Sequence, residues 1–508
     1  MGQTPNLLIL MADQLAPRML PAYGGSVART PHIDALARAG VVFESFYCNS
    51  PLCAPSRFSF MAGQLPSKIG AYDNAAEFPA QVPTFAHYLR AAGYQTALSG
   101  KMHFCGPDQL HGFEDRLTTD IYPADFGWTP DWSRFAERPG WYHTMESVIT
   151  AGACTRTNQI DFDDEVVAAA RQKLFDIARS KDSRPFCLVV SMTHPHDPYV
   201  IPTAYWNRYR DEEIDLPRVP DLAGREDPHS TRLRHVIGLD LAKPSTAQIR
   251  AARRAYCGAV SYVDDQIGSM INTLKEAELD RNTVTVLLAD HGDMLGERGL
   301  WYKMSFYEGA CRIPLIVHAP GRFAPRRVTA VASLLDLLPT FAALANGGAE
   351  PAYAAPIDGH NLLPQLAANA PERNAAEVVG EYLAEGAIAP IIMIRRGRHK
   401  YVHSPADPDQ LYDLESDPDE RKNLATDLGF AEAIAQFRTE VARRWSLPEL
   451  HEAVLASQRR RHFVYTTLRQ GEQHPWDFQP RRDASRLYIR NDQELNDLER
   501  MARFPRLA

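Results

Sequence analysis

The stretch NLLILMADQ, residues 6–14, places an apolar run directly before the acidic Asp13 and the amide Gln14. A run without polar alternation is typical of a strand that other parts of the protein cover on both faces. Such strands occur in parallel sheets, where polar residues that follow the strands gather at one edge. We therefore predict a buried strand over residues 6–11 that ends in a functional site.

Further apolar runs and amphipathic segments alternate along the chain up to about residue 370. Strands are predicted at residues 41–47, 95–99, 186–192, 283–289 and 313–317. Helices are predicted between Thr30-Pro31 and Gly40 and at residues 84–92, 163–180, 248–278 and 333–345. This alternation predicts an α/β fold with a central, mostly parallel sheet flanked by helices.

The alternation of predicted strands and helices changes after about residue 370. We therefore predict three units: 1–370, 371–446 and 447–508. In the second unit, short strands at 378–382, 391–395 and 399–403 predict a smaller antiparallel sheet. The third unit is predicted to contain a polar helix, 449–470, followed by an extended tail. Aromatic residues of this tail favour docking on a neighbouring subunit of a homo-oligomer, a dimer or tetramer: Trp476, Phe478, Tyr488 and Phe504.

Composition and charge exclude several classes of protein. The formal net charge of -8 argues against a nucleic-acid partner. No apolar run approaches the ~20 residues that a membrane-spanning helix needs, and the N-terminus lacks a signal-peptide layout. We therefore expect a cytoplasmic protein without a membrane partner. The seven scattered cysteines favour neither a disulfide framework nor a zinc site.

Polar residues directly follow four of the predicted strands. They are Asp13 and Gln14, Lys101 and His103, His194 and His196, and Asp290 and His291. Any one of these groups alone fits a loop or a helix cap equally well. Four groups in register at strand ends predict a ligand site, because ligands of open α/β sheets bind outside the carboxyl ends of the strands.

The pentapeptide Cys53-Ala54-Pro55-Ser56-Arg57 precedes a segment, 58–63, that is predicted to be helical. A helix start offers free N–H groups and a partial positive charge, which suits an anionic group. At this point Cys53 also fits the common role of a small, buried residue.

The same pentapeptide, followed by Phe58-Ser59-Phe60-Met61-Ala62-Gly63, resembles the sulfatase signature of the alkaline-phosphatase-like superfamily. Further matching motifs follow in the family's order: Asp13, Lys101-Met102-His103, Pro195-His196-Asp197-Pro198, Asp290-His291-Gly292-Asp293, Lys303 and Gln410-Leu411-Tyr412-Asp413-Leu414. The resemblance implies that a formylglycine-generating enzyme converts Cys53 to formylglycine. Its hydrate would be the nucleophile, and the reaction would pass through a covalent hemiacetal sulfate.

The resemblance also implies a divalent metal held by Asp13, Gln14, Asp290 and His291. This oxygen-rich set suits Ca²⁺ first, with Mn²⁺ or Mg²⁺ as alternatives. Gln14 departs from the second aspartate of many sulfatases, a departure shared with some phosphonate monoester hydrolases and choline sulfatases.

Five side chains are assigned by the resemblance to the chemistry around the nucleophile. Arg57, Lys101 and Lys303 would surround the sulfate. His196 would protonate or orient the leaving-group oxygen, and His103 would accept a proton in the breakdown of the hemiacetal. Each histidine also fits a hydrogen-bonded core or loop residue. His194 is a less suitable partner of His196.

Longer stretches resemble the choline sulfatases: residues 50–55, 63–67, 72–77, 99–103, 106–114, 117–128, 293–301 and 474–477. This resemblance implies hydrolysis of choline-O-sulfate to choline and sulfate. Trp128, His143 beside Trp141-Tyr142, and Glu385 would bind the quaternary ammonium, since aromatic faces and carboxylates attract such cations. Asn496 stands where an acid is expected, which leaves room for a different small sulfate ester.

Two other functions stay open at the level of sequence. The first is a phosphonate monoester or phosphodiester hydrolase, which would use the same nucleophile and metal. In that enzyme Trp128, His143 and Glu385 would have no role. The second is a non-catalytic anion-binding protein in which Cys53 stays a thiol. Binding alone would not need proton-transfer groups, which argues against this function: Lys101, His103, His196 and Lys303.

Overall fold

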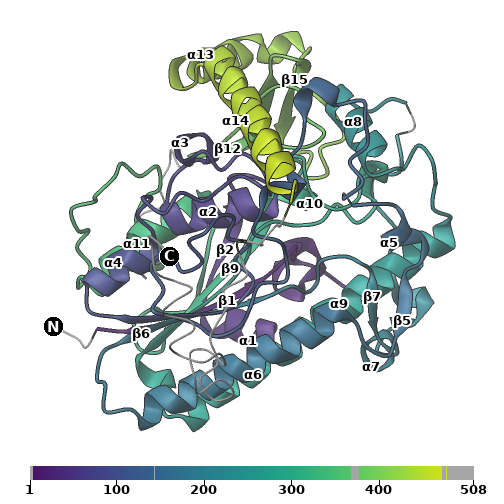
Figure 1. Ribbon diagram of the computed structural model, residues 1–508. Helices are drawn as coiled ribbons and strands as arrows, with labels where there is room; N and C mark the ends of the chain where they lie inside the picture. Colours follow the sequence, from purple (N-terminus) through teal and green to yellow (C-terminus); the bar gives the residue numbers. More distant parts are fainter. Residues whose placement is uncertain (1–3, 142, 223, 368–376, 472–475, 477–508) are drawn as a thin grey trace, which may run out of the picture.

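A nine-stranded, mostly parallel sheet forms the centre of the larger part of the molecule (Figure 1). The structure is a computed structural model that describes residues 4–141, 143–222, 224–367, 377–471 and 476. Within these residues the strand order is β10-β2-β9-β8-β1-β6-β3-β4, and β11 also pairs with β2.

Four parallel strands at the middle of this sheet confirm the predicted positions. They are β1 (Asn6–Ala12), β3 (Gln95–Gly100), β6 (Phe186–Met192) and β8 (Thr283–Ala289). β1 lies between β6 and β8, and Ala12 is in register with both Met192 and Ala289. The residues that follow these strands therefore leave the sheet at one edge.

The remaining strands make the sheet mixed. β9 (Arg312–His318) runs antiparallel to both β8 and β2 (Val41–Tyr47). Short strands complete the two edges: β4 (Asp115–Arg116), β10 (Arg326–Val328) and β11 (Ala332–Ser333). A separate two-stranded sheet pairs β5 (Gly152–Cys154) with β7 (Val200–Pro202).

Helices cover both faces of the central sheet (Figure 1). One group is α1 (Pro31–Ala39), α6 (Asn158–Arg179) and α9 (Thr246–Glu276); the other is α2 (Cys53–Ala62), α4 (Phe85–Ala91) and α11 (Leu337–Ala345). The sequence placed the start of α6 at residue 163. It begins at Asn158 because the Thr157 side chain accepts a hydrogen bond from Ile160 N at 3.1 Å.

Several short helices connect these elements. They are α3 (Pro66–Ile69), α5 (Glu146–Ile149), α7 (Thr203–Trp206), α8 (Pro228–Val236), α10 (Glu308–Cys311) and α12 (Leu363–Leu366). The 3-10 turn η3 (Phe126–Trp128) lies in the loop after β4. No helix within the described ranges combines the length and apolarity needed to cross a membrane.

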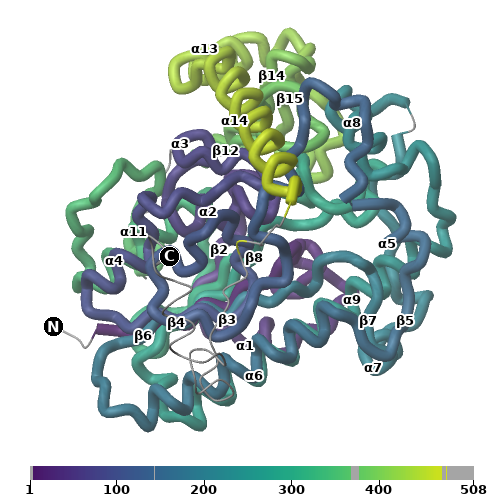
Figure 2. The backbone as a smooth tube through the Cα atoms, in the orientation of Figure 1, coloured from purple at the N-terminus to yellow at the C-terminus, as the bar shows by residue number. Residues whose placement is uncertain are grey.

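A four-stranded antiparallel sheet follows: β12 (Glu377–Tyr382), β13 (Ile391–Arg396), β14 (His399–Ser404) and β15 (Asp407–Asp413). The first three strands confirm the prediction; β15, with the polar sequence DPDQLYD, was not predicted. Helix α13 (Ala431–Arg444) packs on one face of this sheet in a second core. Figure 2 shows α14 (Leu447–Leu468) leading from here back toward the central sheet, where it contacts η3.

Candidate active site

Cys53 is the first residue of α2, and the whole of this helix is buried. Two hydrogen bonds fix the helix start. The Ala54 N–H donates to Asn74 Oδ1 at 3.0 Å, and the Ser56 hydroxyl donates to the carbonyl of Asp290 at 2.5 Å. The second bond ties α2 to the end of β8, so Cys53 lies at the edge where the parallel strands end.

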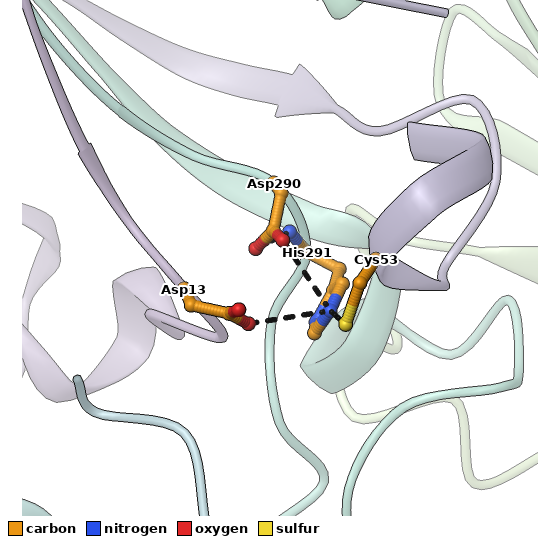
Figure 3. Close-up of side chains that lie close together, drawn as sticks. All are labelled: Asp13, Cys53, Asp290 and His291. Atoms are coloured by element: carbon orange, nitrogen blue, oxygen red, sulfur yellow. Dashed lines mark hydrogen bonds and ion pairs between the residues drawn. The ribbon is translucent and has the colours of Figure 1, made fainter. Parts of the chain in front are cut away.

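Asp13, Cys53, Asp290 and His291 point toward one another from the ends of β1 and β8 and the start of α2 (Figure 3). Their potential ligand atoms all lie within 4.8 Å of one another. His291 Nδ1 donates to the Gly292 carbonyl at 3.0 Å, which leaves Nε2 to face Asp13 Oδ1 at 3.6 Å. Asp13 Oδ1 is buried without a hydrogen-bond partner, which is unfavourable unless a cation compensates it. This donor set fits a divalent metal.

Gln14 lies beside this cluster. Its backbone N–H donates to Asp290 Oδ1 at 3.1 Å, and its backbone has a positive φ of 65°. The side-chain oxygen accepts a hydrogen bond from Lys303 Nζ at 2.8 Å, while Nε2 donates to Asp293 Oδ2 at 2.7 Å. Gln14 therefore contacts Asp290 of the predicted metal site through its backbone, while its amide oxygen contacts Lys303.

Two fully buried cations adjoin the same carboxylates. Arg57 Nε lies 2.8 Å from Asp290 Oδ2, its Nη2 lies 3.4 Å from Asp13 Oδ2, and Lys101 Nζ also contacts Asp13 Oδ2. Burial alone would raise the pKa of Asp13, but Lys101, His196 and Arg57 hold it at about 2. The Asp13 carboxylate is therefore ionised and available as a ligand.

The electrostatic field at Cys53 favours an anion. Burial would raise the pKa of the thiol, but the charges of Lys101, Lys303 and His291 hold it well below its usual value. The same field would act on any negatively charged group that occupies the position of this side chain.

His196 and Lys303 form a hydrogen-bonded pair on the other side of Cys53. Lys303 Nζ donates to His196 Nε2 at 2.7 Å, and His196 Nδ1 donates to the Asp197 carbonyl at 2.6 Å. The pair is buried but borders a cavity, because both His196 and Asp197 line it. A proton held between these groups can reach a molecule bound there.

His103 is buried between two aromatic rings, with Tyr122 at 5.2 Å and Trp128 at 5.8 Å between ring centroids. Burial lowers its pKa, so the ring is neutral and can accept a proton. His194 instead donates from Nδ1 to Asp163 Oδ2 at 2.7 Å and does not line the cavity. This placement agrees with its lesser predicted role.

A cavity of about 380 Å³ opens onto Cys53. Two of its walls are Trp128 and Trp141, whose rings stack 6.1 Å apart at 14°. Glu385 forms another wall; it is 3% exposed, and neither carboxylate oxygen has a hydrogen-bond partner. Burial raises its pKa to about 8. A buried carboxylate without a partner, next to stacked indoles, suits a compact organic cation.

His143 also lines the cavity, where its ring stacks on Tyr302 at 4.6 Å. Its Nδ1 lies 3.1 Å from Asp197 Oδ2, and burial lowers its pKa to about 4. Tyr142 and Asn496 lie outside the residues that the structure describes.

Comparison with known proteins decides the family. The model of the sulfatase family matches residues 5–347. The chain belongs to the sulfatase family. A model described as the C terminus of choline sulfatase matches residues 452–504, and one described as the C terminus of N-sulphoglucosamine sulphohydrolase matches residues 296–446.

Two curated sulfatases cover most of the chain. A choline-sulfatase of Rhizobium meliloti is 47% identical over 510 residues, 99% of each chain. An uncharacterized sulfatase, YidJ, of Escherichia coli is 30% identical and covers 84% of each chain. A solved phosphonate monoester hydrolase of Agrobacterium radiobacter has a TM-score of 0.68, with 23% identity over 88% of this chain and 96% of its own. That likeness concerns the fold alone.

The sulfatase site contains residues to which sequence reasoning gave no role. Asp197, which bridges His143 and Gln14, lies inside a quoted motif and could have been found there. Tyr122 lies under Lys101, with Nζ 4.1 Å from the ring centroid. Asn74 is likewise part of the cavity wall. The latter two lie in stretches that resemble the choline sulfatases, 72–77 and 117–128, but these stretches are long and do not single out one side chain.

Proposed function

We propose that this sulfatase hydrolyses choline-O-sulfate to choline and sulfate. The observation that carries the proposal is Glu385, a buried carboxylate without a hydrogen-bond partner in the wall of the cavity above Cys53. A neutral or anionic leaving group would offer this carboxyl group no compensating charge if it ionised. The full-length relative named choline-sulfatase supports the same substrate.

The cavity suits a quaternary ammonium group. Such a group cannot donate a conventional hydrogen bond, and it is held by aromatic faces and by nearby negative charge. Trp128 and Trp141 offer stacked indoles, and His143 is held neutral by burial, so it adds no repulsive charge. Choline would occupy this space while its sulfate points toward Cys53.

We propose that Asp13, Gln14, Asp290 and His291 hold a divalent cation, with Ca²⁺ as the first choice and Mn²⁺ or Mg²⁺ as alternatives. The unpartnered Asp13 Oδ1 supports this set. The cation would lower the pKa of the attacking hydroxyl and polarise the sulfate. The set contains only two carboxylates, because Gln14 stands as a neutral amide, and this moderates its negative charge.

We propose that Cys53 is converted to formylglycine, as is general in this family, by a formylglycine-generating enzyme; its hydrate supplies the hydroxyl that attacks sulfur. Arg57 pairs with Asp290 and Lys101 pairs with Asp13, which fixes these side chains beside the nucleophile. Lys303 holds positive charge beside the transferring sulfate, where charge shifts during the reaction.

We assign one proton transfer to each side of the nucleophile. The pair of Lys303 and His196 would supply a proton to the departing choline oxygen, because it borders the cavity and shares a hydrogen bond. His103 would accept the proton that is released when the sulfated enzyme breaks down, because burial keeps its ring neutral.

The remaining proposals concern organisation. We propose that 1–370, 371–446 and 447–508 are the three units of the chain, supported by the separate core under the small sheet. Assembly as a dimer or tetramer and the cytoplasmic location stay predictions.

The proposal is tested by comparing kcat/KM for choline-O-sulfate, 4-nitrophenyl sulfate and a phosphonate monoester. The protein must first show conversion of Cys53 by peptide mass spectrometry. We expect choline-O-sulfate to be preferred by about a hundredfold or more. A preference for the phosphonate would favour the alternative phosphonate hydrolase. A fully converted protein that turns over none of them would point to anion binding alone.

A further inference from the structure

The C-terminal helix α14 forms hydrogen bonds with the loop that carries Trp128. Three of its side chains, at helical spacings of three and four residues, face this loop. The hydrogen bonds join Arg461 Nη1 to Thr129 Oγ1 at 3.1 Å, His462 Nε2 to the Pro130 carbonyl at 3.2 Å, and Trp132 N to Gln458 Oε1 at 3.0 Å. The segment directly after Trp128 is therefore held by an element more than 300 residues away, since Arg461 and Thr129 are separated by 332 positions.

Arg461 is the central residue of this contact. It is 5% exposed and forms a bidentate ion pair with the fully buried Asp73, with distances of 2.6 and 2.7 Å. Its Nε also donates to Ser457 Oγ at 3.1 Å. The planar fork of arginine can serve a carboxylate and a hydroxyl at once, which the ammonium group of lysine cannot do with the same geometry.

Thr129 connects Arg461 to the turn that carries Trp128. Its hydroxyl donates to the Phe126 carbonyl at 2.8 Å and accepts from Arg461. The first bond adds to the Thr129 backbone N–H bond to the same carbonyl at 3.2 Å, which closes the turn η3 at the end where Trp128 stands. Loss of the arginine would leave this turn without its fixed partner, and the Trp128 ring could tilt away from Trp141.

Asp73 connects Arg461 to the other walls of the cavity. The next residue, Asn74, lines the cavity and binds the N–H of Ala54 at the start of α2. The charge of Asp73 also contributes, after burial, to the raised pKa of Glu385. An Asp73 carboxylate without its arginine would oppose ionisation of Glu385 more strongly.

We propose that Arg461 is a positioning residue that sets the selectivity of the enzyme for a cationic leaving group. It does so by fixing the Trp128 turn through Thr129 and by neutralising Asp73 behind the cavity. This inference rests on the proposed function. It assigns a role in specificity to the helix in the region that resembles the choline sulfatase C terminus.

The test measures kcat and KM of Arg461→Met for choline-O-sulfate and for 4-nitrophenyl sulfate, with conversion of Cys53 verified. We expect KM for choline-O-sulfate to rise about tenfold or more, the scale of a lost cation–aromatic contact. Both constants for the aryl sulfate should change by less than about threefold, because the nucleophile and its cations are untouched. The matched control is Arg460→Met, the exposed neighbour on the same helix, which should behave as wild type.

Three further variants separate positioning from folding. Asp73→Asn combined with Arg461→Met leaves no unpaired buried charge, and it should still show the raised KM for choline-O-sulfate. Thr129→Val removes only the link to the turn and should raise that KM by about threefold or more. Arg461→Lys should recover part of the loss, since it restores the charge without the fork.

The outcomes distinguish the inference from the proposed function. A wild-type enzyme without preference for choline-O-sulfate overturns both. A wild-type preference that Arg461→Met and the double variant retain, or an equal loss on both substrates, overturns the inference alone. A loss confined to choline-O-sulfate supports it.

Discussion

At the scale of one residue, the proposed cation-binding side chain Glu385 lies where its ionisation is unfavourable. Burial raises its pKa to about 8, and neither oxygen has a hydrogen-bond partner. A carboxylic acid in such a place destabilises the folded protein once it must ionise. A bound cation removes that penalty. The residue proposed to bind the substrate therefore lowers the stability of the folded enzyme when the cavity is empty.

The first prediction concerns stability. The folded pKa of Glu385 is raised, so its favourable contribution is complete below the unfolded pKa, near 4.5, and is lost as pH rises through about 8. Glu385→Gln should therefore unfold with a higher free energy than wild type at about pH 9, by roughly 1.4 kcal/mol for each unit of pKa shift that it abolishes. Urea unfolding at about pH 9 and about pH 5 checks this; equal differences at both values would contradict it.

The second prediction concerns substrate affinity. Below about pH 8 the empty cavity holds a protonated Glu385, and a cation binds the ionised form better. KM for choline-O-sulfate should therefore fall as pH rises toward about 8, whereas KM of Glu385→Gln should be higher, by about tenfold, and independent of pH. KM measured across this range with 4-nitrophenyl sulfate as the reference is the check. A parallel pH trend for the aryl sulfate would rule out Glu385 as its source.

At the scale of single residues, sequence motifs identified many of the side chains that the structure brings together. Asp13, Lys101, His196 and Asp290 each follow an apolar run, and residues at the ends of parallel strands must meet. The sequence could not predict that Asp197 bridges His143 and Gln14, or that Tyr122 covers Lys101. Those contacts depend on how irregular loops fold over the strand ends.

At the scale of elements, strands buried on both faces were predicted almost to the residue, because an apolar run marks its own ends. β6 and β8 are examples, with every residue buried. β15 was missed because its sequence is polar and its burial is confined to the last residues. The direction of β9 could not be predicted either, since an apolar strand between two others fits either orientation.

The third prediction tests where α6 begins. The Thr157 side chain caps the helix by accepting from Ile160 N, and the residue also lines the cavity. Thr157→Ser should keep stability near wild type, whereas Thr157→Val should lower the free energy of unfolding by about 1 kcal/mol. Urea unfolding of both variants is the measurement. Unchanged stability of Thr157→Val would mean that the helix starts later, as its hydrophobic pattern alone suggested.

At the scale of the whole molecule, the central sheet aligns the ends of β1, β3, β6 and β8, and α14 reaches back from the small sheet to the cavity loop. The alignment of these parallel strand ends follows from general rules of α/β folds. The pairing of Arg461 with Asp73, 388 positions apart, does not, because no local pattern shows which loop residue a helical arginine meets.

The fourth prediction concerns the metal. Binding to the folded state alone stabilises it by mass action, so chelation should lower Tm and readdition of Ca²⁺ should restore it. Asp13→Asn should make Tm insensitive to the metal, since it removes one of two carboxylates from the cluster. Scanning calorimetry with Ca²⁺, Mn²⁺ and Mg²⁺ in turn is the check. A Tm that does not respond to any of these metals would contradict the proposed set of metal ligands.

The most direct test of the central claim compares choline-O-sulfate with 3,3-dimethylbutyl sulfate, which has the same shape but carbon in place of the quaternary nitrogen. Both substrates present the same alkyl sulfate to Cys53, so only recognition of the positive charge differs. The account predicts that kcat/KM favours choline-O-sulfate by about a hundredfold, with the preference reduced to below about tenfold in Glu385→Gln. Equal kcat/KM for the two esters in the wild-type enzyme would contradict it.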